Sequence, residues 1–216
     1  MNKKCELQRI DELLEIDKDI DICSNEYKRI KFIYEQAMTE IENKIKVFQG
    51  EFNIFYNRVL IERVLSRIKS EESILKKMEN KSLKFSYKDM INNINDIAGV
   101  RVVCPLKCDI YIVRSLITNL QGINIIKEKD YVRNPKESGY SSYHMIIEVP
   151  VSFSYGIIYV KVEIQIRTLA MDFWSSIEHK MKYKSLNGIT SSKSKQFVKY
   201  SKILRKIDDK IMSTNT

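Results

Sequence analysis

Residues Val160–Thr168 read VKVEIQIRT, the clearest strand pattern in the chain. Its apolar residues, at positions 160, 162, 164 and 166, alternate strictly with polar ones. Alternation with a period of two places the two sets on opposite faces of a β-strand. One face is aliphatic and can be buried, whereas the other presents Lys161, Glu163, Gln165 and Arg167, spaced by about 6.5 to 7 Å. From the pattern alone, a solvated polar face is the commoner interpretation, and a functional face is the alternative.

Further strands and helices are expected on either side of this strand. Residues 97–104 read as a buried strand that ends at Pro105, and 143–149 should pair with 157–167 as an antiparallel hairpin. Apolar residues at helical spacing predict helices over 7–20, 26–48, 52–68, 71–78, 109–120, 169–183 and 196–212. Together these elements predict an α+β protein with a mixed β-sheet. Its parts are an N-terminal helical region over 1–66, a core over 67–184 and a basic C-terminal helix over 185–216.

Composition narrows the class of protein. The 216 residues carry a net charge of +9, which favours anionic partners such as nucleic acid or phosphorylated small molecules. No apolar run approaches the roughly 20 residues that span a bilayer, and the N-terminus lacks the apolar region of a signal peptide. We therefore expect a cytoplasmic protein with no membrane partner. The four cysteines and two histidines show no zinc-ligand spacing, so the cysteines are interpreted as reduced and structural.

Two segments suit the binding of phosphates. Arg67–Lys77 reads RIKSEESILKK, with cations before a helix N-terminus, hydroxyls in its first turn and two lysines one turn later. The loop Lys127–His144 interleaves cations with tyrosines, which suits a surface that stacks a base and holds phosphates. Taken singly, the Arg67–Lys77 segment is better explained as an ordinary charged helix face, and a disordered basic loop is the alternative interpretation of Lys127–His144.

Two carboxylates and the absence of other catalytic motifs indicate the class of chemistry. Asp96 precedes the strand that carries Arg101, and with Glu163 it can hold a divalent cation, because Mg²⁺ commonly takes one or two carboxylates plus phosphate oxygens and water. The chain has no Walker-type glycine loop, no dinucleotide fingerprint and no Ser-His-Asp or Cys-His arrangement. Phosphoryl-type transfer fits such residues, since positioning and charge neutralisation carry most of its rate.

Several separated motifs resemble the RelA/SpoT-type alarmone synthetase family, and they occur in the family's order. They are DIAGVR at 96–101, GYSSYH at 139–144, VEIQIRT at 162–168, MDFW at 171–174 and EHK at 178–180. With the Arg67–Lys77 segment they span 67–184, about half of the chain. The short helical flanks resemble the small, single-domain members of the family, and the family's hydrolase domain has no counterpart here.

The resemblance implies a nucleotidyltransferase-like fold and the synthesis of (p)ppGpp in the stringent response. Pyrophosphate would pass from ATP to the ribose 3′-hydroxyl of GDP or GTP, with release of AMP and with no hydrolase activity. Glu163 and Asp96 are implied as catalytic residues and Mg²⁺ ligands, Glu163 lying near the 3′-hydroxyl as metal ligand or general base. The implied ATP-binding residues are Arg67, Lys69, Ser73, Lys77 and Arg101. The implied acceptor-binding residues are Lys129, Lys136, Tyr140, His144 and Gln165, with Tyr140 stacking on guanine.

The chain departs from the family's usual loop sequence, Asn-Gly-Tyr-Arg-Ser-Leu-His. Ser138, Ser141 and Tyr143 replace the Asn, Arg and Leu of that pattern, and the loss of a cation at position 141 leaves the choice among GMP, GDP and GTP open. The family's small members are often tetramers, so a homo-oligomer is expected.

Two other functions remain as alternatives. One is a basic RNA-binding module without turnover, and the Lys- and Arg-rich segment Ser194–Lys210 also keeps a secondary RNA contact among the expectations. The other is a related nucleotidyltransferase that moves a nucleotide instead of pyrophosphate.

Overall fold

A mixed β-sheet forms the centre of the molecule in the computed structural model, which describes residues 7–9, 18–184 and 191–214. Five strands follow one another in the order β2-β3-β6-β5-β4, and β1 pairs with β6 outside this path. Their bounds are β1 Leu7–Arg9, β2 Arg63–Ile68, β3 Ala98–Cys104, β4 Asn124–Asp130, β5 Tyr143–Phe153 and β6 Gly156–Thr168. The pairs β1–β6 and β3–β6 are parallel and the others are antiparallel, which confirms the predicted mixed α+β fold.

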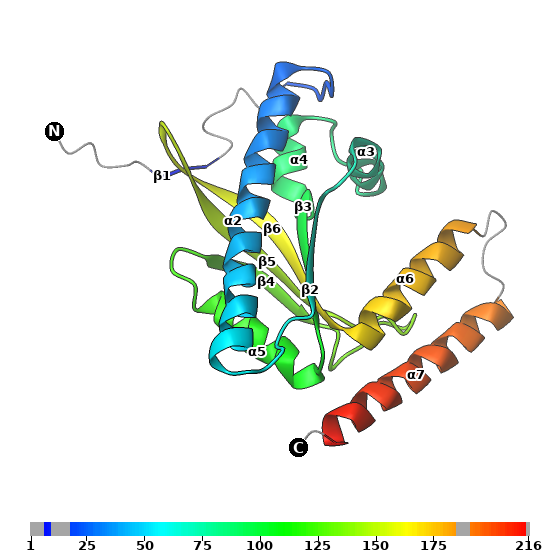
Figure 1. The fold of residues 1–216 in the computed structure, drawn as a ribbon. Helices are drawn as coiled ribbons and strands as arrows, with labels where there is room; N and C mark the ends of the chain where they lie inside the picture. Colours follow the sequence, from blue (N-terminus) through cyan, green and yellow to red (C-terminus); the bar gives the residue numbers. More distant parts are fainter. Residues whose placement is uncertain (1–6, 10–17, 185–190, 215–216) are drawn as a thin grey trace.

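The longest helix, α2 (Asn25–Phe55), lies along one face of the sheet (Figure 1). Its N-terminus is capped by Ser24, whose hydroxyl accepts a hydrogen bond from the Tyr27 amide at 3.1 Å. Buried side chains recur at helical spacing along it, among them Ile30, Tyr34, Ala37, Ile41 and Ile45. This stripe packs against the apolar face of the sheet, so the predicted helix over 26–48 is confirmed and extends to Phe55.

The remaining helices among the described residues are all shorter than α2. They are α3 Glu71–Asn80, α4 Tyr87–Asn93, α5 Lys107–Thr118, α6 Leu169–Lys184 and α7 Ser191–Thr214, with α6 and α7 side by side in Figure 1. In the part of the chain that the structure describes, no helix has the length and apolarity needed to cross a bilayer.

The alternation of the VKVEIQIRT segment is confirmed. Val160, Val162, Ile164 and Ile166 are fully buried in the core, as the pattern predicted. The opposite face of β6 carries the polar set and lies away from α2, which packs on the apolar face. The predicted hairpin is also present, although β5 continues past Pro150, which pairs with Tyr159, and turns only after Phe153.

Two predicted helices are wrong where tertiary pairing overrides local periodicity. Within the predicted helix over 7–20, Leu7–Arg9 is a strand that pairs with Ile157–Tyr159 of β6, and residues 10–17 lie outside the described residues. Within 52–68, the helix ends at Phe55, Asn57 adopts a positive φ of 46°, and the chain enters β2. Pairing of β2 with β3 along its whole length outweighs the helical spacing of its apolar residues.

Two elements were not predicted. Strand β4 begins before the Lys127–His144 segment that was interpreted as a loop and ends within it. It was missed because its residues are mostly exposed and give little apolar pattern. Helix α4 has only seven residues, too few to show a clear periodicity.

Candidate active site

Rows of facing residues cross the polar face of the sheet, because strand register brings side chains of adjacent strands together. The first row holds Arg67, Gly99, Glu163 and Ile146. The second holds Leu65, Arg101, Gln165, His144 and Lys129, and the third holds Arg63, Val103 and Arg167. Residues from all five strands of the β2-β3-β6-β5-β4 path therefore meet on one surface.

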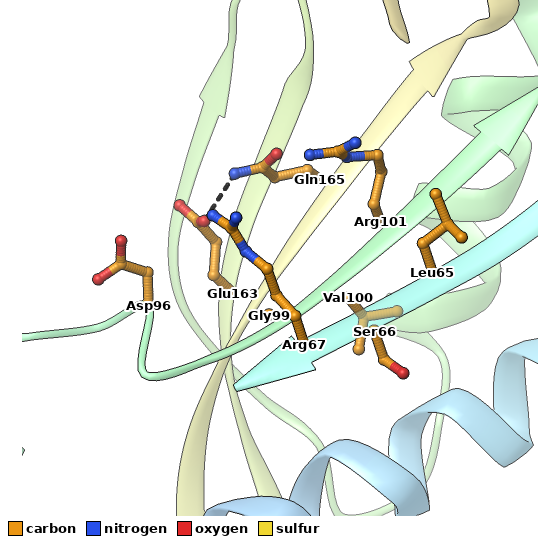
Figure 2. A pocket seen from close by; sticks show the side chains of 9 residues that line it. All are labelled: Leu65, Ser66, Arg67, Asp96, Gly99, Val100, Arg101, Glu163 and Gln165. Atoms are coloured by element: carbon orange, nitrogen blue, oxygen red, sulfur yellow. Dashed lines mark hydrogen bonds between the residues drawn. The ribbon is translucent and has the colours of Figure 1, made fainter. Parts of the chain in front are cut away.

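A first cavity of about 190 Å³ lies over β2, β3 and β6 (Figure 2). Its lining residues are Leu65, Ser66, Arg67, Asp96, Gly99, Val100, Arg101, Glu163 and Gln165. Gly99 forms its floor, and a Cβ atom there would be 3.9 Å from the Arg67 carbonyl oxygen and 4.0 Å from that of Glu163. Because Gly99 has no side chain, the space between Arg67 and Glu163 stays open.

A second cavity of about 350 Å³ adjoins the first and is strongly cationic. Five lysines line it, together with other polar side chains and one isoleucine; the whole set is Lys77, Lys81, Asn93, Asn95, Asp96, Lys127, Lys129, Tyr131, Lys136, His144, Ile146 and Glu163. Such a concentration of ammonium groups attracts an anionic ligand. Asp96 and Glu163 line both cavities and therefore lie at their boundary.

The Asp96 carboxylate has one occupied and one free oxygen. Lys69 and Lys77 donate to Oδ2 at 2.9 and 2.8 Å, whereas Oδ1 is buried with no hydrogen-bond partner among the described residues. Burial raises the pKa of Asp96, but the hydrogen bonds from Lys77 and Lys69 outweigh it and hold the pKa below its usual value. Asp96 is therefore ionised at neutral pH, and its free oxygen fits a cation.

Glu163 is held by two neighbours. Gln165 Nε2 donates to its Oε2 at 2.7 Å, and His144 Nδ1 lies 3.4 Å from its Oε1. Burial raises the pKa of Glu163, but the hydrogen bonds from His144 and Gln165 outweigh this and lower it. Within the described residues, no group of three or more Asp, Glu, His or Cys side chains gathers as a metal site. A cation at Asp96 and Glu163 would need its other ligands from phosphate and water, which suits Mg²⁺.

The loop between β4 and β5 contributes Tyr131 to the lining of the second cavity, and the Tyr140 ring lies 6.3 Å from that of Tyr131. Gly139 has a φ of +83° and its amide donates to the Lys136 carbonyl, which folds the loop back on itself. The Lys136 ammonium lies 4.8 Å from the Tyr131 ring centroid and 5.0 Å from that of Tyr140. Ser141 Oγ donates to the Tyr131 carbonyl at 2.9 Å, so this departure from the family pattern fastens the loop.

The structure brings nearly all predicted site residues together. Arg67, Asp96, Arg101, Glu163 and Gln165 line the first cavity, and Lys77, Asp96, Lys129, Lys136, His144 and Glu163 line the second. Lys69 reaches Asp96, and the Tyr140 hydroxyl lies 2.8 Å from His144 Nε2. Ser73 accepts a hydrogen bond from Ser70 and is not among the described residues that line either cavity.

Sequence reasoning missed several lining residues. Tyr131 lies in the Lys127–His144 segment, and the alternation of lysines and tyrosines in that segment was the signal that could have identified it. Asn93 and Asn95 carry no pattern that marks them.

Tyr143, a second departure from the family pattern, donates to Glu128 at 3.2 Å, and Arg114 binds the same carboxylate through two nitrogens.

The chain is similar in sequence to known proteins over most of its length. A family profile described as "Region found in RelA / SpoT proteins" matches residues 66–188. The chain is 37% identical to the GTP pyrophosphokinase YwaC of Bacillus subtilis, over 90% of this chain and 92% of that protein. It is 33% identical to the GTP pyrophosphokinase YjbM of the same organism, over 86% and 87% of the two chains.

Solved structures give the same result. Small alarmone synthetase 1 from Bacillus subtilis, bound to its product pppGpp, superposes with a TM-score of 0.83 at 32% identity, covering 89% of this chain and 97% of that one. Small alarmone synthetase 2 from the same organism superposes with a TM-score of 0.80 at 36% identity, covering 88% and 97%. The likeness thus extends beyond the profile region into the flanking elements.

Proposed function

The chain belongs to the RelA/SpoT family, and on this premise we propose that it is a small alarmone synthetase with GTP pyrophosphokinase activity. It transfers pyrophosphate from ATP to the ribose 3′-hydroxyl of GDP or GTP and releases AMP. One observation carries the mechanism: two ionised carboxylates, Asp96 and Glu163, lie at the boundary of two adjoining cavities, each lined by cations. Such a boundary suits a reaction that joins two anionic nucleotides.

ATP occupies the first cavity. Arg67 and Arg101 flank the adenine, since planar guanidinium groups stack on aromatic rings. Lys69, Ser73 and Lys77 bind the phosphates, and the contacts of both lysines with Asp96 support this by holding their ammonium groups at the reaction centre. The β-phosphorus then lies toward the boundary with the second cavity.

The guanosine nucleotide occupies the second cavity. Its base stacks on Tyr140, while Lys129 and Lys136 contact its phosphates, His144 lines the same cavity and Gln165 supports the ribose side. The lysine-rich lining supports this assignment, because a nucleoside di- or triphosphate requires several cations. The 3′-hydroxyl then faces Glu163.

Glu163 orients the acceptor hydroxyl and accepts its proton. The 3′-oxygen forms a bond to the β-phosphorus, the bond from that phosphorus to the α–β bridging oxygen breaks, and AMP leaves. Asp96 and Glu163 are the side chains that would hold Mg²⁺, as the free Oδ1 of Asp96 supports. When bound, Mg²⁺ supplies neutralisation of the charge that develops on the phosphates.

The test is a nucleotide assay on the purified chain. The protein is incubated with ATP, Mg²⁺ and GMP, GDP or GTP in separate reactions, and the products are resolved by chromatography. We expect AMP together with a 3′-pyrophosphorylated guanosine nucleotide, and the three reactions rank the acceptors. Release of pyrophosphate in place of AMP would assign the chain to nucleotidyl transfer, and RNA binding without turnover would favour the RNA-binding module.

Three further properties belong to the same proposal. A homotetramer is supported by large apolar side chains that stay exposed on α2 and α7, such as Phe55, Ile203 and Ile207. A secondary RNA contact is supported by the net charge of +9, and a cytoplasmic location by the nucleotide substrates. Sedimentation and salt-dependent RNA binding measure the first two.

A further inference from the structure

Five polar side chains form a closed circuit on the polar face of the sheet. Arg167 Nη2 donates to the Tyr140 hydroxyl at 2.7 Å and to Gln165 Oε1 at 2.6 Å. The Gln165 amide donates to Glu163 at 2.7 Å. On the other side, the Tyr140 hydroxyl lies 2.8 Å from His144 Nε2, and His144 Nδ1 lies 3.4 Å from Glu163. Two chains of polar contacts, or arms, therefore run from Arg167 to Glu163. One passes through Gln165, and the other passes through Tyr140 and His144.

The chemistry of the end groups gives the circuit a direction. A guanidinium can only donate hydrogen bonds, and an ionised carboxylate can only accept them. With its oxygen accepting from Arg167, Gln165 turns its NH₂ group toward Glu163. Tyr140 likewise accepts from Arg167 and directs its own proton to His144 Nε2, which leaves the Nδ1 proton for Glu163. Every donor in both arms points toward Glu163.

Arg167 is itself fixed from the far side. It is only 3% exposed, and so is Asp172 in α6, whose Oδ1 lies 3.4 Å from Arg167 Nη1. The guanidinium also lies over the Tyr140 ring, 5.2 Å from its centroid. A buried cation is retained only when it is paired and hydrogen-bonded, so this arginine has one well-defined position.

We propose that Arg167, anchored by Asp172, is a positioning residue that holds the acceptor-stacking ring of Tyr140 and the carboxylate of Glu163 in one fixed relation. This rests on the proposed function, in which the guanine base stacks on Tyr140 and the 3′-hydroxyl of the same nucleoside faces Glu163. The base and the reacting oxygen are thus aligned by two side chains that share one anchor. A loss of alignment by about 1 Å can cost 10²-fold in rate.

The variants are Arg167→Lys, which keeps the charge but not the planar fork, and Tyr140→Phe, which keeps the stacking ring but breaks one arm. We expect kcat for pyrophosphate transfer to fall by about 10- to 100-fold in each. The KM for ATP should stay within a factor of two, because neither side chain lines the first cavity. The KM for the guanosine acceptor should rise by only a few-fold, since the ring and the lysines remain.

Arg63→Lys is the matched control. Arg63 Nη2 binds the same Asp172 carboxylate at 2.8 Å but makes no contact in the circuit, and its side chain is half exposed. The same exchange there should leave kcat and both KM values unchanged. A loss equal to that of Arg167→Lys would mean that any weakening of the Asp172 ion pairs is enough, and it would overturn the positioning role.

The double variant Arg167→Lys/Tyr140→Phe separates positioning from independent structural damage. If both variants break the same circuit, the double variant should lose no more kcat than the more damaging single variant. If their effects are independent, the two fold-losses in kcat should multiply. If Arg167→Lys fails to fold by circular dichroism, the Tyr140→Phe result decides alone, because removal of one hydroxyl leaves the core intact. Full kcat in a folded Tyr140→Phe protein overturns the inference. Wild-type protein that makes no product at all would instead refute the proposed function.

Discussion

Glu163 shows how a single residue acquires a role from its neighbours. By sequence it is one of four polar residues that alternate along a strand, and such residues are usually solvated. In the fold, Gln165 and His144 orient its carboxylate and keep its pKa low, and Asp96 lines the same cavities. An ionised, oriented carboxylate is the form that can take a proton from a hydroxyl.

The first prediction concerns this carboxylate. Glu163→Gln should lower kcat by at least about 10²-fold, because an amide cannot accept the proton. Nucleotide dissociation constants measured by calorimetry should stay within a few-fold, since the cationic linings are intact. Glu148→Gln, the same exchange on the neighbouring strand β5, is the control and should keep wild-type turnover. Full activity of Glu163→Gln would remove Glu163 from its proposed role.

The second prediction concerns the floor of the first cavity. Gly99→Ala places a Cβ at ordinary contact distances, 3.9 and 4.0 Å from backbone oxygens, so the fold should tolerate it. Alanine also costs a strand less conformational entropy than glycine, and the thermal midpoint should not fall. The added methyl group takes up part of the cavity that we propose for ATP, so the KM for ATP should rise by roughly 10-fold while the KM for the guanosine acceptor stays constant. An unchanged KM for ATP would show that ATP binds elsewhere.

At the scale of elements, α7 contacts the end of β6 and the loop between β4 and β5. Thr168, the last residue of β6, donates to Asp208 of α7 at 2.8 Å, and both side chains are buried. Ser201 of the same helix packs against Gly139, where an added Cβ would lie 2.0 Å from its oxygen. The loop that carries Tyr140 can therefore take its observed path only because position 139 is glycine.

The third prediction concerns the buried Asp208. Burial raises its pKa more than Thr168 and Lys107 lower it, so the folded state binds the proton more readily than the unfolded chain does. The ionised form therefore costs stability, and this cost appears as the pH rises through the raised pKa and is absent below the unfolded value of about 3.9. Asp208→Asn should raise the thermal midpoint at pH 7 by roughly 1 to 4 °C.

This gain should shrink as the pH is lowered toward 4, where Asp208 binds its proton in the folded state. Glu40→Gln is the control, because that side chain is exposed on α2, an element that does not carry Asp208. It should leave the midpoint unchanged at both pH values. A gain for Asp208→Asn that is independent of pH would contradict the assigned cause.

At the scale of the whole molecule, several large apolar side chains stay exposed and are not buried in the core. Along α7, Tyr200, Ile203, Ile207 and Ile211 are between 45% and 53% exposed, at a spacing that puts them on one side of the helix. A contiguous apolar stripe of this kind marks an interaction surface more often than a solvated one. It fits the expected assembly of several copies of the chain.

The fourth prediction tests that assembly. The wild-type chain should sediment as an oligomer, with a tetramer as the expected size. The double variant Ile203→Glu/Ile207→Glu should sediment as a smaller species, because each isoleucine contributes about 1.5 to 3 kcal/mol when buried. Lys202→Glu, an exposed residue on the same helix, alters charge without removing apolar surface and should leave the assembly intact. A wild-type chain that sediments as a monomer would refute the expectation.

Much of the fold was predictable, and the failures have a common cause. The strands over 97–104 and 157–167 and the helix over 26–48 were predicted because their periodicity reflects burial, which is local in sequence. Leu7–Arg9 and β2 were assigned to helices because strand pairing is a long-range interaction that leaves no local pattern. The division of the chain at 66 and 185 stays a prediction.

The type of fold, the buried face of β6, the family and the charged residues of the candidate site could all be inferred from the order of the amino acids. The relations among those residues emerge only in the folded chain: Asp96 and Glu163 border two cavities, Tyr131 lines the second cavity, and Arg167 links Tyr140 to Glu163. The reason is physical. Periodicity records which face of an element is buried, whereas the partners of a polar side chain depend on strand register and on loops distant in sequence.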